Sequence, residues 1–332
     1  MIEVKDTSQV AEARRAAVVL AQAHGFGEAD AGRVAIVATE LATNLLKHGE
    51  GGELLVGSYD DSSGSGVECL ALDKGPGMAD IVGSMRDGHS TAGSAGTGLG
   101  AVARGAHLTD IYSGPEVGTA ILARLEIGRP EHFRPRRQPH YGALAIAYPG
   151  EEACGDSWCR RPHGSGHAVM VADGLGHGPF AAEASHAASR AFLAAGDVAP
   201  SEMLVAMHAA LRPTRGAAVG IAQIDEAAGK IVFAGVGNIA ATIVDRDMGV
   251  QRMVSNNGTI GHIARHMRDF TYALGDEALV ILASDGLATN WRLDAYPGLF
   301  AHHPTLIAAI LYRDFTRGRD DVTVFVARTG AA

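Results

Sequence analysis

The sequence predicts an α+β protein made of two halves, each of which places runs of strands beside runs of helices. Residues 8–24 and 29–48 are rich in alanine and repeat their apolar residues at helical spacing. The second half consists mainly of short alternating segments that are typical of strands. Between the halves lies a segment of three prolines and four arginines, residues 129–139, with almost nothing apolar to bury. We therefore expect one domain over residues 1–128, a linker, and a second domain over residues 140–330.

The individual strands and helices follow from the same apolar patterns. In the first half, alternation after the two helices predicts strands at residues 54–58, 67–72, 111–112 and 119–125. In the second half, it predicts strands at residues 142–148, 167–172, 217–224, 231–234, 240–244, 279–283 and 321–326. Helical spacing predicts helices at about residues 180–212 and 304–313. Helices therefore open the first half, and strands dominate the second.

Composition and charge exclude several classes of protein. The 332 residues are 47% hydrophobic and 20% charged, which is typical of a globular chain and not of a disordered one. With 28 Lys and Arg against 37 Asp and Glu, the net charge is −9, which disfavours nucleic acid as a partner. No apolar run approaches the ~18 residues of a membrane-spanning helix, so no membrane partner is expected.

The amino end and the cysteines bear on location. Residues 1–6 have neither the basic cap nor the apolar core of a signal peptide. The three cysteines are odd in number and lack CxxC spacing, which fits a reducing compartment. We therefore expect a cytoplasmic protein. The basic linker is interpreted either as a short solvated spacer or as a segment that docks on the acidic first half.

Polar residues recur along one face of the second helix. Glu40, Asn44 and His48 are four residues apart, so they share a face beside an apolar stripe. An amide oxygen at such a position can bind magnesium, and a carboxylate one turn earlier can polarise water or a hydroxyl group. The alternative is an exposed helical flank without a role.

Two glycine-rich segments follow in the same half. Asp73-Lys74-Gly75-Pro76-Gly77 comes directly after an apolar strand, where a carboxylate can accept the amino hydrogen of a purine and glycines permit a tight turn. Residues 93–100, Gly-Ser-Ala-Gly-Thr-Gly-Leu-Gly, lead into a helical pattern and offer backbone N–H groups to phosphates. Neither a Walker A lysine nor a Rossmann strand–turn–helix accompanies them.

The order ExxxN, DxGxG and GTGLG resembles the N, G1 and G2 boxes of the GHKL (Bergerat-fold) ATPases, and residues 1–128 resemble their RsbT/RsbW/SpoIIAB branch of serine kinases from bacterial partner switching. Further residues that carry the resemblance are Gly25-Phe26-Gly27, Met78, Met85-Arg86-Asp87-Gly88-His89-Ser90-Thr91 and Gly118-Thr119. The resemblance implies that Asn44 holds Mg²⁺-ATP and that Glu40 is the base for a protein hydroxyl. It implies that Asp73, in the turn of Gly75 and Gly77, reads adenine together with Thr119. The residues implied to cover the phosphates are Gly96, Thr97, Gly98, Leu99 and Gly100. No phosphoacceptor-histidine helix pair precedes the domain, and His48 is expected at the cleft edge.

Acidic residues in the second half stand at the ends of expected strands. Asp156 is expected in a loop before a strand, Asp173 and Asp285 follow apolar strands, and Asp320 and Asp321 precede the last one. Clustered carboxylates repel one another unless divalent cations lie between them, and oxygen ligands favour Mg²⁺ or Mn²⁺ over zinc. Two such ions can generate hydroxide near neutral pH for attack at phosphorus. Each Asp-Gly pair taken alone can equally be a turn.

Residues 140–330 resemble the metal-dependent protein phosphatases (PPM), specifically their SpoIIE/RsbX branch. The motifs are Gly155-Asp156-Ser157, Val171-Ala172-Asp173-Gly174-Leu175-Gly176-His177-Gly178, Ala283-Ser284-Asp285-Gly286 and Asp320-Asp321-Val322-Thr323. The resemblance implies two Mn²⁺ or Mg²⁺ ions, bridged by Asp173 with help from the Gly174 carbonyl. The remaining implied ligands are Asp156, Asp285 and Asp320, the last favoured over Asp321. The branch generally lacks the phosphate-holding arginine of other PPM members, and the sequence offers no clear substitute. The expected folds are a Bergerat-type α/β sandwich and a PPM-type α-β-β-α sandwich.

The role of His177 stays open between a general acid for the leaving serine oxygen and a cap for the following helix. Taken together, the resemblances imply a bifunctional regulator of a bacterial stress or sigma-factor switch, a kinase and a phosphatase acting on STAS-type antagonist proteins. Implied partners are STAS-domain or stressosome-like proteins and a downstream phosphatase or sigma-factor regulator. Two alternatives remain: a phosphatase whose ATP-binding half only senses nucleotide, and an anti-sigma-like binding module.

Overall fold

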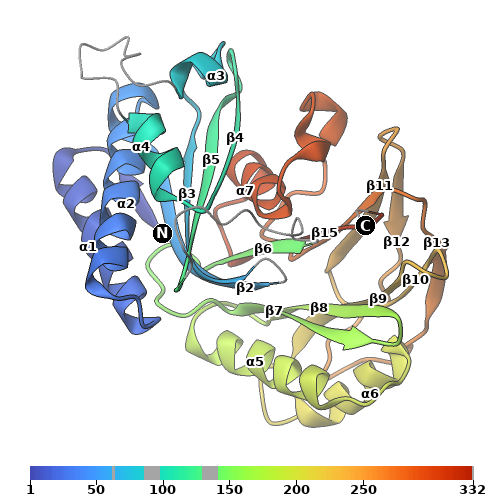
Figure 1. Ribbon diagram of the computed structural model, residues 1–332. Helices are drawn as coiled ribbons and strands as arrows, with labels where there is room; N and C mark the ends of the chain where they lie inside the picture. Colours follow the sequence, from blue (N-terminus) through green and yellow to red (C-terminus); the bar gives the residue numbers. More distant parts are fainter. Residues whose placement is uncertain (62–63, 86–97, 129–140, 331–332) are drawn as a thin grey trace. The chain divides into compact units, whose positions relative to one another are not determined.

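The computed structural model describes residues 1–61, 64–85, 98–128 and 141–330 (Figure 1). The chain divides into two compact units. Unit 1 comprises Met1–Pro139 and Ala301–Arg313, and unit 2 comprises His140–Phe300 and Asp314–Ala332. The chain therefore leaves unit 2 after Phe300, contributes one segment to unit 1, and returns.

Unit 1 is built on a five-stranded antiparallel sheet with the order β1-β2-β3-β5-β4. The strands are β1 (Ile2–Val4), β2 (Gly52–Asp61), β3 (Gly64–Asp73), β4 (Leu108–Gly114) and β5 (Gly118–Glu126). Every residue of β3 from Val67 to Asp73 is buried, so both faces of the sheet must be covered.

Three helices cover one face of this sheet: α1 (Thr7–Ala23), α2 (Glu28–His48) and α4 (Gly98–Gly105). The stripe Val34, Val37, Leu41 and Leu45 of α2 packs into one core with the inward residues of β3 and β5. A capping box at Asp6 starts α1, in which the Gln9 side-chain oxygen accepts the Asp6 backbone N–H. Both helices expected from the sequence are confirmed. The short helix α3 (Ile81–Ser84) follows the turn after β3.

The segment Ala301–Arg313 lies against the second face of the same sheet. The Asp110 carboxylate on β4 accepts hydrogen bonds from the His303 backbone N–H, at 2.7 Å, and pairs with the His302 ring, at 2.8 Å. The Arg124 guanidinium on β5 donates to the Thr305 hydroxyl at 3.0 Å. Helix α7 (Pro304–Phe315) begins in this segment, so a helix from late in the chain completes unit 1.

Arg124 is the central charge of this second face. Its side chain is 3% exposed and forms ion pairs with Glu68, at 2.9 Å, and Asp61, at 2.5 Å. Burial raises the pKa of Glu68, and the charge of Arg124 lowers it. The Arg124 guanidinium therefore compensates the charge of both carboxylates.

We expect Arg124→Met to lower the free energy of unfolding by roughly 3–5 kcal/mol, because it leaves buried carboxylates without a cation. Denaturant unfolding measures the change. Arg15→Met on the exposed face of α1 is the matched control and should change stability by less than about 0.5 kcal/mol. Adding Glu68→Gln to Arg124→Met should recover part of the loss. Equal effects of the Arg124 and Arg15 substitutions would contradict the assigned role.

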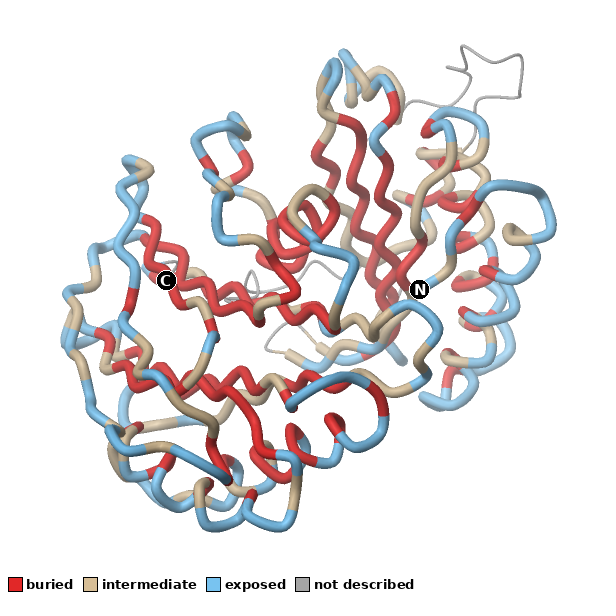
Figure 2. The backbone as a smooth tube through the Cα atoms, turned by 180° about the vertical axis from the view of Figure 1, so that it is seen from behind, coloured by how far each residue is buried: buried red, intermediate tan, exposed pale blue. Residues whose placement is uncertain are grey.

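Unit 2 is a sandwich of two five-stranded sheets, with orders β13-β10-β9-β8-β7 and β12-β11-β14-β15-β6. The first sheet contains β7 (Asp156–His163), β8 (Gly166–Gly174), β9 (Ala217–Asp225), β10 (Lys230–Val236) and β13 (Phe270–Ala273). The second contains β6 (Tyr141–Ile146), β11 (Ala240–Asp245), β12 (Val250–Met253), β14 (Ala278–Ala283) and β15 (Val322–Arg328). Phe233 and Phe325 belong to the core between the sheets, and the middle strands are buried along most of their length (Figure 2).

Helices α5 (Pro179–Ala194) and α6 (Pro200–Ala210) pack on the outer face of the first sheet around Phe192 and Met203. Single turns η1 (Leu293–Ala295) and η2 (Leu299–Ala301) precede α7. The α+β class predicted for both halves is confirmed. The sequence reading differs from the structure in detail: the expected helix over 180–212 is two helices, and β1, β7, β12 and β13 were not expected as strands.

Candidate functional site

Asp73 ends strand β3 and turns its carboxylate back onto the sheet. Its Oδ1 accepts hydrogen bonds from the backbone N–H groups of Gly75 and Thr119, each at 3.0 Å. Burial raises the pKa of Asp73, and these two hydrogen bonds lower it. Oδ1 is thereby fixed, and Oδ2 is the oxygen that can accept a hydrogen bond from a ligand.

The turns around Asp73 are held by a second set of bonds. The Ser113 hydroxyl lies 2.9 Å from the Thr119 hydroxyl and accepts the Met78 backbone N–H at 2.8 Å. Gly77 has a φ of +71°, and a Cβ there would lie 2.0 Å from the Gly114 carbonyl oxygen. Asp73, Gly75, Gly77 and Thr119 are therefore brought together, as the sequence predicts.

The polar face of α2 meets the start of α4. A Cβ on Gly98 would lie 3.2 Å from Asn44 Oδ1 and 3.3 Å from Glu40 Oε2. Asn44 Nδ2 is buried without a hydrogen-bond partner among the described residues. A bound ligand with an acceptor atom could satisfy this donor. His48 is exposed, in keeping with a cleft-edge position.

The remaining nucleotide-loop residues divide into two groups. Gly98, Leu99 and Gly100 form the first turn of α4, whose free N–H groups suit an anion. Gly96 and Thr97 lie outside the described residues, as do the motif residues 86–91 and the linker 129–139. Glu40 and Asn44 thus face the beginning of α4, the helix that follows the glycine-rich segment 93–100.

In unit 2 the acidic residues gather where strands of both sheets end. Asp156 is the first residue of β7 and pairs in register with Asp173 near the end of β8. Asp156 is therefore in a strand and not in the loop expected from the sequence. In the other sheet, Asp285 follows β14 and Asp320 precedes β15, and these strands are neighbours.

The electrostatics show that these carboxylates face one another. Burial raises the pKa of Asp173, and the charges of Asp156, Asp285 and Asp320 raise it further. Burial and the charges of Asp321 and Asp320 raise the pKa of Asp156, whereas the Ser284 and Thr323 side chains lower it. Such repulsion between carboxylates is the condition under which a divalent cation stabilises a cluster.

Asp321 differs from Asp320 in its surroundings. It is 2% exposed, its Oδ1 accepts the Tyr148 backbone N–H at 2.8 Å, and a Cβ on Gly155 would lie 2.5 Å from its Oδ2. Asp320 is half-buried, and its charge acts on the three other carboxylates of the cluster. These surroundings support Asp320 as the ligand facing the cluster and Asp321 as its buried neighbour.

The donor set fits a divalent cation. Oδ2 of Asp156 is buried and lacks a hydrogen-bond partner among the described residues. The same is true of Oδ2 of its neighbour Asp321, which is not one of the proposed ligands. All the side-chain donors are carboxylate oxygens, which suit Mg²⁺ or Mn²⁺. Within the described ranges, no three Asp, Glu, His or Cys side chains are already arranged as a metal cage. The cluster therefore offers the charges and orphan oxygens for an ion without a preformed coordination sphere.

His177 is oriented beside this cluster. Its Nδ1 lies 2.8 Å from Glu151 Oε1, and its ring stacks on Tyr148 with centroids 4.6 Å apart. Helix α5 begins after Gly178 without a side-chain cap, so His177 does not cap it. With Nδ1 engaged and 47% of the side chain exposed, Nε2 is available to a substrate atom.

Two arginines near the acidic loops were missed from the sequence. The Arg215 guanidinium lies next to Gly176 and over the Phe180 ring, 5.0 Å from its centroid. Burial and the charge of Asp320 raise the pKa of Asp285, and the charge of Arg317 opposes this rise. Neither arginine belongs to a recognisable motif, so only the fold reveals them as cations that a phosphate could meet.

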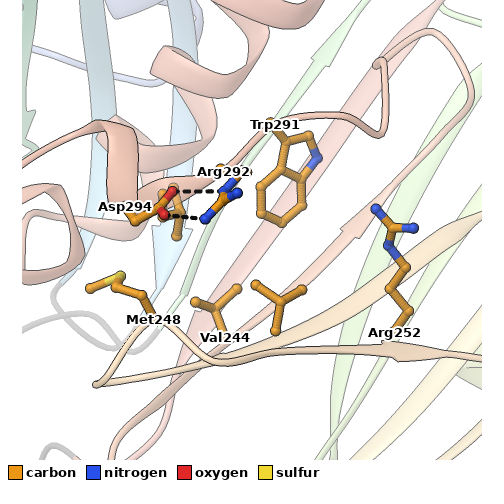
Figure 3. A pocket seen from close by; sticks show the side chains of 8 residues that line it. Val244, Met248, Arg252, Trp291, Arg292 and Asp294 are labelled. Carbon is orange, nitrogen blue, oxygen red and sulfur yellow. Dashed lines mark hydrogen bonds and ion pairs between the residues drawn. The ribbon is translucent and has the colours of Figure 1, made fainter.

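A separate cavity of about 350 Å³ opens on β11 and β12. Val244, Val250 and Met248 give it an apolar floor, Trp291 and Arg252 flank it, and Arg292 pairs with Asp294 (Figure 3). Its lining includes none of the acidic cluster, so the cavity and the cluster are separate features of unit 2.

Comparison with known proteins identifies both halves. Residues 163–330, half of the chain, match the family model described as Stage II sporulation protein E (SpoIIE). The chain belongs to the SpoIIE family. Its C-terminal part is accordingly a PPM-type serine/threonine phosphatase domain, as the resemblance in the sequence implied.

The amino-terminal part of this SpoIIE-family chain has relatives of another kind. Residues 4–125 match the model of a histidine kinase-like ATPase domain. Over 117 residues, the chain is 35% identical to the serine/threonine-protein kinase RsbT of Bacillus subtilis (strain 168), covering 34% of this chain and 86% of RsbT. The GHKL and RsbT-like resemblance is thereby confirmed.

Two solved structures are similar to part of this chain. One, from work entitled "The bacterial stressosome: a modular system that has been adapted to control secondary messenger signaling", is 27% identical with a TM-score of 0.53. The match covers 57% of this chain and 98% of that one. RsbX in complex with magnesium is 20% identical with a TM-score of 0.49, covering 58% of this chain and 96% of RsbX. The chain therefore joins an RsbT-like half of the histidine kinase-like ATPase type to a SpoIIE-family half.

Among the described helices, none combines the length and apolar character that a membrane crossing requires.

Proposed function

We propose that the protein both adds and removes phosphate on Ser or Thr of STAS-type antagonist proteins in a cytoplasmic partner-switching pathway. The observation that carries the phosphatase half is the cluster of Asp156, Asp173, Asp285 and Asp320, in which burial and the charges of the other three carboxylates raise the pKa of Asp173. The observation that supports the kinase half is the approach of Glu40 and Asn44 to Gly98.

In unit 2, Asp156, Asp173, Asp285, Asp320 and the Gly174 carbonyl would hold two Mn²⁺ or Mg²⁺ ions. When bound, these ions supply hydroxide near neutral pH and neutralise charge at phosphorus. Glu151 holds Nδ1 of His177, so Nε2 can carry the proton that the leaving serine oxygen requires. Arg215, at the edge of the same loop, is placed to meet a phosphoryl oxygen.

In unit 1, Asp73 Oδ2 accepts an N–H from the adenine amino group, with Thr119 beside it. Asn44 would bind the Mg²⁺-phosphate group, and Gly96, Thr97, Gly98, Leu99 and Gly100 would cover the phosphates. The Glu40 carboxylate would take the proton from the Ser or Thr hydroxyl as its oxygen bonds to the γ-phosphorus and the bond from the γ-phosphorus to the β-phosphate oxygen breaks, so that ADP leaves. These roles need one bound nucleotide and one protein substrate in unit 1.

The kinase assignment is tested by incubating the full chain with Mg²⁺, γ-labelled ATP and a STAS-domain protein. Glu40→Gln should slow label transfer at least ~10²-fold while leaving ATP affinity nearly unchanged, because it removes the base and not the binding groups. Glu12→Gln on exposed α1 is the control. After ATP is removed, Mn²⁺ should release the label as phosphate.

Other outcomes select the alternatives. ATP binding without label transfer in the wild type would make unit 1 a nucleotide sensor attached to a phosphatase. Stoichiometric binding of a sigma factor with negligible turnover in either direction would make the chain an anti-sigma-like binding module.

A further inference from the structure

Helix α7 carries a buried arginine to the nucleotide-reading turn of unit 1. The Arg313 side chain is 7% exposed, and its Nη1 donates a hydrogen bond to the Asp73 backbone carbonyl at 2.9 Å. Arg313 lies 240 residues after Asp73 and within the stretch that matches the SpoIIE model. A residue from the phosphatase-matching sequence thus contacts the end of β3 in the ATPase-like unit.

Gly118 makes room for this contact. Asp73 pairs in register with Thr119, so the turn before β5 lies over the end of β3. A Cβ on Gly118 would lie 2.3 Å from the Asp73 carbonyl oxygen and 3.1 Å from Arg313 Nη1. The guanidinium therefore lies against both chain segments that carry the proposed adenine-reading groups.

The charge of Arg313 acts on the same carboxyl group. Burial raises the pKa of Asp73, whereas the N–H bonds from Gly75 and Thr119 and the charge of Arg313 lower it. A buried carboxylate without a cation tends to take up a proton. A protonated Asp73 would no longer present a charged acceptor to an adenine amino group.

Other ionisable residues surround the turn at its surface. His48 and Glu50 after α2, Lys74 after β3 and Glu116 before β5 are all exposed, so solvent screens their charges. They are unchanged when Arg313 is replaced, so they are common to the variants that are compared.

We propose that Arg313 is a positioning residue for nucleotide recognition, which holds the Asp73 main chain in place and keeps its carboxylate able to accept the adenine amino hydrogen. The proposal rests on the proposed nucleotide-binding role of Asp73. It means that the segment 301–313, which sequence comparison counts with the phosphatase, completes the nucleotide site. Nucleotide selectivity then depends on residues outside the region that matches the ATPase model.

The test measures binding of fluorescent (mant-labelled) ADP and GDP to the full chain with Mg²⁺ at about pH 6 and pH 8. Arg313→Met should weaken ADP binding about tenfold at pH 6, because a protonated Asp73 no longer offers a charged acceptor to the adenine amino group. Binding should recover at pH 8, and discrimination against GDP should fall, because a neutral Asp73 can donate to the guanine O6. The wild type should change little between the two pH values. Arg15→Met is the exposed control.

Arg313→Lys retains the positive charge and should keep most of the selectivity, and thermal unfolding checks that each variant is folded. The proposal is overturned if Arg313→Met binds both nucleotides like the wild type. It is also overturned if affinity falls equally for both nucleotides at both pH values, or if the Lys variant loses discrimination as fully as the Met variant. Wild-type affinity in Asp73→Asn would instead refute the nucleotide role of Asp73 itself.

Discussion

Replacing Asp173 by asparagine is expected to abolish Mn²⁺-dependent hydrolysis of para-nitrophenyl phosphate, with a fall in kcat on the order of 10³-fold or more. Asp173 lies at the end of β8, in register with Asp156, and its carboxylate is acted on by three other carboxylates of the cluster. An amide at this position cannot supply the anionic oxygens that two divalent ions would share. The measurement is initial rate against Mn²⁺ concentration for both proteins.

Asp247→Asn, in the exposed turn between β11 and β12, is the matched control and should retain the wild-type rate. Substantial Mn²⁺-dependent turnover in Asp173→Asn would contradict the central place given to this residue. No turnover in the wild type, with metal binding intact, would mean that the site needs its protein substrate to assemble. That result would favour the alternative in which the chain is an anti-sigma-like binding module.

Sequence patterns were sufficient where a site is made from consecutive residues at the end of an element. Glu40 and Asn44 are one turn apart on α2, and Asp73 and Gly75 share one turn, so their proximity is local. The acidic loops were also readable, because Asp173, Asp285 and Asp320 each adjoin an apolar strand. Local propensity and spacing decide such features before any tertiary contact forms.

Features that depend on tertiary packing could not be predicted from the sequence. Strand β7 begins at Asp156 with Arg160 and Arg161 in its middle, so its sequence lacks clean apolar alternation. Arg215 reaches the acidic loops only through the fold, and Arg313 reaches Asp73 across 240 residues. Nothing in the pattern of α7 distinguishes a helix that covers its own domain from one that joins the other unit, because either requires an apolar face.

The acidic cluster also predicts how stability responds to pH and metal. Burial, followed by repulsion from neighbouring carboxylates, raises the pKa of Asp173 to about 8, and burial with repulsion from Asp321 raises that of Asp156 to about 7. In the unfolded chain both groups titrate near ~4. Between these values the folded state binds more protons than the unfolded state, so the free energy of unfolding falls as pH rises. This contribution is fully present below about pH 4 and is lost by about pH 8.

Thermal unfolding in EDTA should therefore give a lower Tm at about pH 8 than at about pH 6, by several degrees. Mn²⁺ takes the place of the protons, so the increase in Tm that it causes should be larger at the higher pH. Histidines titrate in the same range, and the difference between the wild type and Asp173→Asn removes their contribution. Asp173→Asn relieves the repulsion and should have the higher Tm in EDTA at about pH 8, yet gain little from Mn²⁺. A Tm in EDTA that rises with pH in the wild type but not in Asp173→Asn would show that these carboxylates are already compensated within the protein, and that the cluster does not require a cation.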